Sequence, residues 1–74
     1  RAEALEFHIQ KGSPVIGRPI KDLLLIDNLL ICSIYRKGKP MIPNGQDHME
    51  EDDLVVVVTT KKGLHDVKDI LKRG

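Results

Sequence analysis

The densest group of residues able to do chemistry is an acidic segment with one histidine. Its members are Asp47, His48, Glu50, Glu51, Asp52 and Asp53. Carboxylates this close repel one another, and a hard cation such as Ca²⁺ or Mg²⁺ would relieve the repulsion. The spacing lacks the alternating ligands and the central glycine of an EF-hand loop, however. We therefore interpret the segment as a solvated loop and predict no metal site.

The other residue types that carry catalysis are scattered along the chain. His8, His48 and His65 lack the spacing of zinc ligands, and the single Cys32 excludes an internal disulfide and fits a reducing compartment. The glycines form neither G-x-G-x-x-G nor G-x-x-x-x-G-K-[ST], and no nucleophile-elbow pattern surrounds a serine. The sequence therefore predicts a binding or regulatory module, not an enzyme, with no cofactor in this domain.

The length of the chain and its net charge further narrow the classes of protein to which it could belong. The chain has 74 residues, enough for one domain over residues 1–74, and it begins with Arg1, so we expect a fragment of a longer protein. Twelve basic and eleven acidic residues give a net charge of +1. That balance predicts binding to neither nucleic acid nor an anionic membrane. No apolar run approaches the roughly 18 residues that a membrane span needs, so we expect no membrane insertion.

Hydrophobic patterning predicts an α+β fold with a mostly antiparallel, four-stranded sheet. Strands are expected at residues 5–9, 29–36, 40–43 and 54–60. The strand at 29–36 is almost continuously apolar, which predicts burial on both faces or a position at an interface. The strand at 40–43 contains two prolines and should lie at an edge of the sheet.

Two helices are predicted to accompany this sheet. A short helix of about two turns is expected after the first strand, because Ile20, Leu23 and Leu24 share one helical face behind Pro19. A C-terminal helix over residues 64–74 is expected to pack on the sheet. Its apolar stripe consists of Leu64, Val67, Ile70 and Leu71.

Four segments, taken in order, resemble a known family pattern. They are GRPIKDL at 17–23, LICSIYRKG at 30–38, IPNGQD at 42–47 and DLVVVV at 53–58. Together they resemble the TrkA C-terminal domain, also called RCK_C, from the regulatory subunit of bacterial Trk potassium uptake systems. The resemblance covers nearly the whole chain from about Glu3 onward. The family's Gly-Asp before the last strand is replaced here by Asp52-Asp53, so the turn there is expected to differ.

The resemblance implies a non-catalytic regulatory domain that is cytoplasmic and peripheral to the inner membrane. It implies a homodimer or gating-ring assembly as partner, and a membrane potassium transporter contacted through the full-length protein. The family's NAD(H) or ATP site lies in a preceding domain, so neither nucleotide is expected here.

Ligand sensing is the least determined part of the resemblance. Analogy with the family places a ligand where the second strand meets its dimer mate, near Asn28, Leu30 and Arg36. Some relatives bind cyclic di-AMP, but the segment Leu25-Ile26-Asp27-Asn28 offers no basic residue for its phosphates. The alternative is a purely structural assembly domain with no small-molecule ligand.

Overall fold

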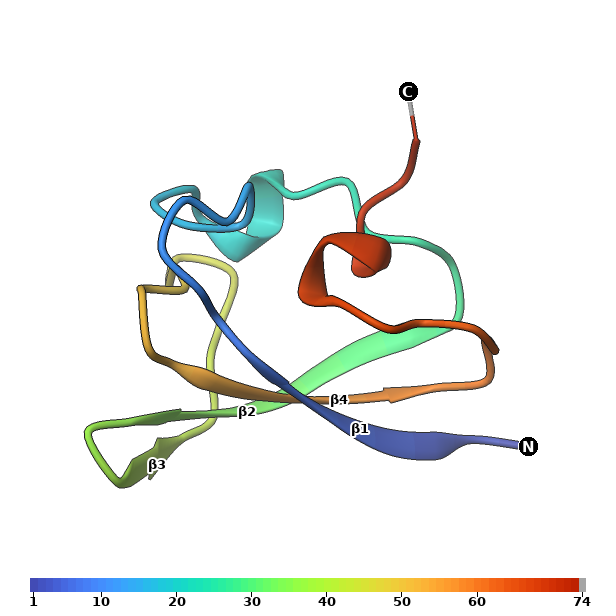
Figure 1. Cartoon of the computed structure of the whole chain (residues 1–74), viewed down its shortest axis with the longest axis horizontal. Helices are drawn as coiled ribbons and strands as arrows, with labels where there is room; N and C mark the ends of the chain where they lie inside the picture. Colours follow the sequence, from blue (N-terminus) through green and yellow to red (C-terminus); the bar gives the residue numbers. More distant parts are fainter. Residues whose placement is uncertain (74) are drawn as a thin grey trace.

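Four antiparallel strands form one sheet in the order β1-β4-β2-β3 in the computed structural model, which describes residues 1–73 (Figure 1). The strands are β1 (Glu3–His8), β2 (Leu29–Arg36), β3 (Lys39–Met41) and β4 (Leu54–Thr59). The predicted sheet is confirmed. Strand β3 pairs only with β2 and lies at an edge, as expected for a strand that contains a proline.

The valine run forms the central strand β4, which pairs with β1 on one side and β2 on the other. Side chains alternate between the two faces of a strand, and here Val55 and Val57 are fully buried while Val56 and Val58 are half-buried. Valine is stiff at χ1 and packs well on a pleated surface, which favours this extended conformation. One face of the sheet therefore forms the core, and the other is only partly covered.

A tight turn joins β2 to β3. Lys37 and Gly38 both have positive φ, at 52° and 76°, as the two central residues of a type I′ hairpin require. Glycine adopts this conformation without steric cost, whereas lysine does not. The turn directs β3 back along β2, with Arg36 opposite Lys39.

The predicted C-terminal helix is wrong. Residues 64–73 contain only η2 (Val67–Ile70), a 3-10 turn of four residues. Leu71, which was expected to continue the helix, is extended and forms an antiparallel bridge with Leu25. Gly74, the last residue of the predicted helix, lies outside the described residues.

Pairing with a distant segment explains this outcome. The carbonyl of Ile70 accepts a hydrogen bond from the Ile26 N–H at 2.8 Å, and the Lys72 N–H donates to the Leu24 carbonyl at 2.7 Å. These backbone groups are then unavailable to an α-helix, in which each N–H bonds to the carbonyl four residues earlier. Val67 and Ile70 are still buried, so the apolar stripe reaches the core through a different backbone conformation.

The predicted helix after β1 is also a single 3-10 turn, η1 (Ile20–Asp22). Its first two backbone N–H groups form hydrogen bonds to the loop before β4. The Ile20 N–H donates to the Asp47 carbonyl at 2.8 Å, and the Lys21 N–H donates to the Gly45 carbonyl at 3.0 Å. Residues 1–73 therefore contain 3-10 turns but no α-helix. In the same range, no helix has the length and apolar character to cross a membrane.

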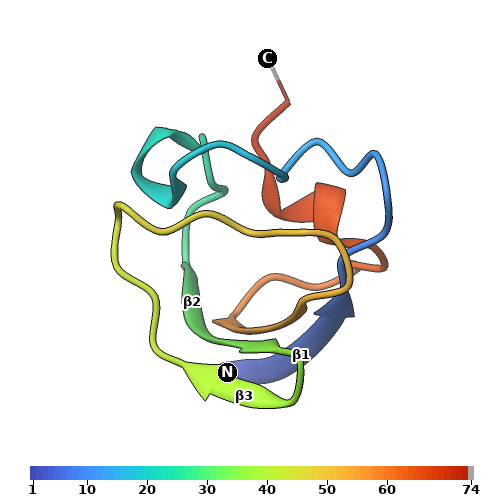
Figure 2. The same ribbon diagram turned by 90° about the vertical axis from the view of Figure 1, so that its left-hand side faces the viewer.

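Both turns and the long loops lie on one side of the sheet, as the two perpendicular views show (Figures 1 and 2). The core lies between this layer and the inner sheet face. Its buried apolar residues are Phe7, Ile9, Val15, Leu23, Ile34, Met49, Val55, Val57, Val67 and Ile70. Within residues 1–73 no segment covers the outer face in this way, and Leu30 on β2 is 65% exposed there.

Candidate functional site

The three residues predicted to bind a ligand lie at different places along β2. Asn28 precedes the strand in a left-handed conformation (φ 60°), and its carbonyl accepts from the Thr59 hydroxyl at 2.8 Å. Leu30 lies on the outer face, whereas Arg36 ends the strand and points toward the inner side. At about 3.3 Å per residue, Asn28 and Arg36 are more than about 20 Å apart. Within one protomer they do not share a pocket, and the ligand prediction stays a prediction.

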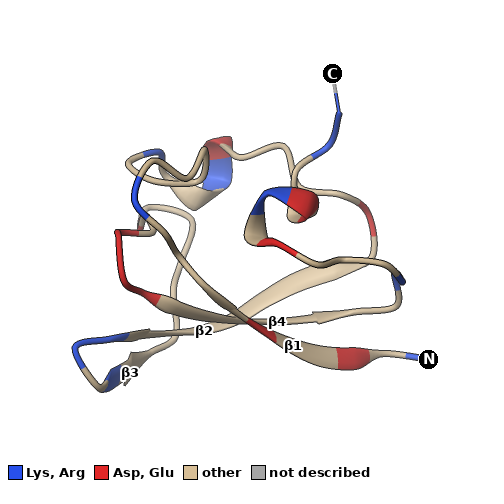
Figure 3. Cartoon of the chain, viewed as in Figure 1, with Lys and Arg blue, Asp and Glu red and all other residues tan. Residues whose placement is uncertain are grey.

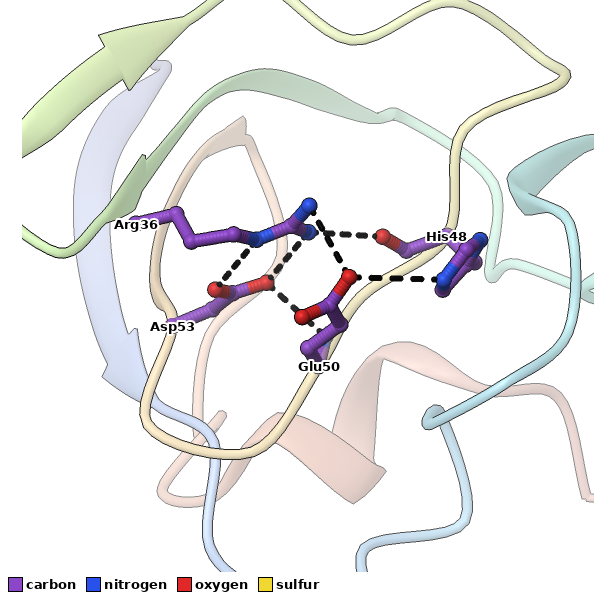
Figure 4. A network of polar contacts seen from close by, with 4 residues as sticks. All are labelled: Arg36, His48, Glu50 and Asp53. Atoms are coloured by element: carbon purple, nitrogen blue, oxygen red, sulfur yellow. Dashed lines mark hydrogen bonds and ion pairs between the residues drawn. The ribbon is translucent and has the colours of Figure 1, made fainter.

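Arg36 is the centre of a polar network (Figure 4). Its Nε and Nη2 donate to the two carboxylate oxygens of Asp53, each at 2.9 Å. Nη2 also donates to the His48 carbonyl at 2.9 Å, and Nη1 lies 3.1 Å from Glu50 Oε2. This is the two-pronged guanidinium–carboxylate geometry, which is among the stronger polar contacts in proteins.

Asp53 is the buried partner of this pair, with only 1% of the residue exposed. Its Oδ2 also accepts the Glu50 N–H at 2.8 Å. Burial acts to raise the pKa of Asp53, but the hydrogen bonds from Arg36 and from the Glu50 backbone outweigh it and hold the pKa below its ordinary value. The hydrogen bond to Asp53 likewise raises the pKa of Arg36, against the opposing effect of burial.

The acidic segment is therefore not simply a solvated loop, and that interpretation needs correction at Asp53. A buried carboxylate is tolerated here because a guanidinium and a backbone N–H satisfy it. No local sequence signal marks this pair, because it depends on the register between two strands. Tyr35 pairs with Leu54, so Arg36 on β2 lies beside Asp53, the residue just before β4.

Most of the other acidic side chains also have protein partners. Asp47 accepts the Asn44 N–H at 2.8 Å, and Asp52 lies 3.3 Å from the His8 ring. Glu50 contacts His48 at 3.5 Å as well as Arg36. These contacts reduce the mutual repulsion without a cation. Across residues 1–73, no three His, Cys, Asp or Glu side chains are grouped so that they could hold a metal ion.

The pKa of Asp53 predicts how stability depends on pH. A carboxyl whose pKa is lower in the folded state stabilises the fold fully above its unfolded pKa, about 3.9, and loses that contribution as pH falls through the lower folded value. We expect the free energy of unfolding, measured in urea, to decrease from about pH 5 to about pH 2. The decrease should be smaller in Asp53→Asn than in Asp52→Asn, which removes an exposed carboxylate. Equal slopes in the two variants would contradict the assignment.

The network connects segments that are far apart in the chain. It joins the end of β2 to residues 48–53, the segment that leads into β4. In the described part of the chain, no serine or cysteine side chain is hydrogen-bonded to a histidine or carboxylate side chain, the arrangement that activates a nucleophile. Fold and site thus define the class: a small, open, antiparallel-sheet domain whose principal polar cluster holds a loop in place.

Comparison with known proteins identifies the family. The family model of the TrkA-C domain matches residues 4–72, so almost every residue from β1 to the end of the C-terminal segment takes part. The chain belongs to the TrkA-C domain family. The resemblance seen in the sequence is confirmed.

Individual relatives agree with this assignment. The chain is 33% identical over 73 residues to a Trk system potassium uptake protein TrkA homolog of Pyrococcus abyssi, covering 97% of this chain and 32% of the relative. It is 34% identical over 70 residues to a protein of the same name from Archaeoglobus fulgidus, covering 95% of this chain and 16% of the relative. The chain therefore spans about a third or less of these curated relatives.

Proposed function

We propose that this domain is a non-catalytic regulatory domain of a potassium uptake protein. The single observation that carries the proposal is the match of the TrkA-C family model to residues 4–72. The two relatives described above are both named Trk system potassium uptake protein TrkA homolog, and this name indicates the process. In this proposal the domain is cytoplasmic and reaches the membrane only through the transporter to which the full-length protein binds.

The domain acts, in this proposal, by pairing with a second copy through the outer face of its sheet. Leu30 is 65% exposed and Tyr35 41% exposed on that face, and Val56 and Val58 on the neighbouring strand β4 are only half-buried. The two 3-10 turns and the long loops lie on the opposite side of the sheet (Figure 2). Covering this face would remove apolar surface from water, at about 25 cal/mol per Å².

Ligand sensing is the finer part of the proposal. Asn28 and Arg36 lie at opposite ends of β2, so a ligand that touches both kinds of residue requires a site built from two protomers. Arg36 already donates to Asp53 and His48, which leaves it few free donors. The alternative, a purely structural assembly domain, is favoured by this internal use of the guanidinium.

A titration separates these two alternatives. The domain would be titrated by calorimetry with cyclic di-AMP, and separately with Mg²⁺. Saturable heat that disappears in Asn28→Ala would support sensing at the proposed position. No heat with either probe would support the structural alternative.

Self-association supplies the main test of the proposed function. We expect Leu30→Asp to weaken dimerisation by at least about tenfold, because a carboxylate would be buried without a partner in the paired face. Analytical ultracentrifugation over a concentration series measures this change. Ile42→Asp is the matched control, since Ile42 is 87% exposed but lies outside the strands of the sheet. A wild-type chain that stays monomeric at high concentration would contradict the proposal.

A further inference from the structure

A groove of about 740 Å³ lies at the end of the sheet where β2 begins and β4 ends. Three stretches line it: residues 26–27 before β2, residues 61–64 after β4, and the C-terminal segment from 68 to 73, with Pro14 at one side. Its size lies within the usual range for small-molecule sites, about 300–1,000 Å³. The groove is separate from the Arg36–Asp53 network, none of whose residues lines it.

The groove concentrates positive charge. Its cationic side chains are Lys61, Lys62, Lys68, Lys72 and Arg73, and its anionic ones are Asp27 and Asp69. Five positive and two negative side chains leave a net +3 here, although the whole chain carries only +1. Figure 3 shows basic residues both on the C-terminal stretch and on the turn that follows β4.

Three of these five cations form no ion pair with another side chain among residues 1–73. Lys62 pairs with Glu3 at 3.0 Å, and Lys72 lies 3.8 Å from Asp27. Among residues 1–73, Lys61, Lys68 and Arg73 take part in no ion pair. Like charges gathered in this way repel one another, and a bound anion would relieve the repulsion.

Asp69 supplies one of the two negative charges of the groove, and its Oδ2 is engaged by backbone N–H groups at the start of η2. That oxygen accepts the His65 N–H at 2.9 Å and the Asp66 N–H at 3.0 Å. These backbone hydrogen bonds lower the pKa of Asp69, which keeps the carboxylate ionised and engaged with the turn.

The walls of the groove are held in place by backbone hydrogen bonds. The C-terminal segment is anchored to residues 24–26 through the Ile70 carbonyl and the Lys72 N–H. Ile26, Leu64 and Leu71 add apolar surface to the lining. A ligand would thus meet cationic side chains on a backbone that is already positioned, together with apolar contacts for an uncharged part.

We propose that this groove binds a small phosphate ester. Lysine and arginine are the usual partners of phosphate oxygens, and the apolar residues would contact the organic part of the ester. The lining contains no aromatic residue, so stacking of the bases of a nucleic acid strand is not supported. This inference is independent of the proposed pairing through the outer sheet face.

The experiment uses the 74-residue chain with AMP and inorganic phosphate as probes, followed by amide chemical shifts in two-dimensional NMR. We expect saturable shifts at residues 61–64 and 68–73, with tighter binding of AMP because only AMP has an organic part. The double variant Lys61→Gln/Lys68→Gln should weaken AMP binding by about tenfold or more. The matched control is Lys11→Gln/Lys39→Gln, which removes the same charge outside the groove and should bind AMP as the wild type does.

Four outcomes of the AMP and phosphate titrations would overturn the proposal. They are no saturable shift with AMP, equal losses in the two double variants, inorganic phosphate binding as tightly as AMP, and shifts centred away from the groove. Phosphatidylglycerol vesicles form a separate arm, since a lipid headgroup is also a phosphate ester. Binding to the vesicles without binding to AMP would likewise contradict a site for a soluble ligand. The urea midpoint of each variant is measured first, so that a folding defect is not mistaken for lost binding.

Discussion

The Asp53→Ala variant is expected to lose about 3 kcal/mol of unfolding free energy, because it removes the fully buried member of a two-pronged ion pair. Arg36 would keep its contacts with the His48 carbonyl and Glu50, but both hydrogen bonds to Asp53 would be lost. The Glu50 N–H would also lose its acceptor. A domain of this length has a total stability of roughly 4–11 kcal/mol, so the loss should be plain in urea or thermal unfolding.

The neighbouring carboxylate provides the control for this variant. Asp52 is exposed, and its one side-chain contact is with the exposed His8 ring, so Asp52→Ala should change stability by no more than about 0.5 kcal/mol. A double-mutant cycle with Arg36→Met then isolates the pair. A coupling energy near zero would show that the loss in Asp53→Ala does not arise from the ion pair.

The Ile70→Ala variant is expected to lose about 3 kcal/mol, since Ile70 is fully buried and truncation leaves a cavity in the core. The side chain comes from η2, so the measurement tests whether the C-terminal segment seals the inner sheet face. The hydrogen bond between the Ile70 carbonyl and the Ile26 N–H involves only the backbone and would remain possible. Chemical denaturation of the two proteins side by side gives the difference.

Leu24→Ala serves as the matched control. Leu24 is an aliphatic residue of the same size in the segment that pairs with the C-terminal stretch, but it is 71% exposed. Its truncation should cost no more than about 0.5 kcal/mol. If Ile70→Ala were equally mild, the C-terminal segment would contribute little to the core, and the packing described above would be wrong.

The strands could be predicted from the sequence because their signals are local. The four valines of β4, the alternation in β1 and the prolines near β3 each restrict the backbone or the burial of a short segment. The two helices could not be predicted correctly. The stripe formed by Val67 and Ile70 fits both an α-helix and a 3-10 turn, and the choice depends on residues 24–26, more than 40 positions away in the chain.

The candidate sites, like the fold, could be predicted from the sequence only in part. The sequence placed Asn28, Leu30 and Arg36 near one strand, and β2 does carry or adjoin all three. The sequence did not indicate that Arg36 is hydrogen-bonded to Asp53. Nor did it indicate that lysines from the turn after β4 and from the C-terminal segment line one groove. The residues of the ion pair and those of the groove are far apart in the chain. They come together only because of the order of the strands and the paths of the loops.

By itself, the sequence determined the family, the antiparallel sheet and the aliphatic composition of the core, because each depends on residue types within short segments. Only the tertiary structure decided which face of the sheet stays exposed, which carboxylate is buried and where the basic side chains gather. Those features depend on contacts between residues far apart in the chain. Such contacts form, and contribute to stability, only once the sheet has formed.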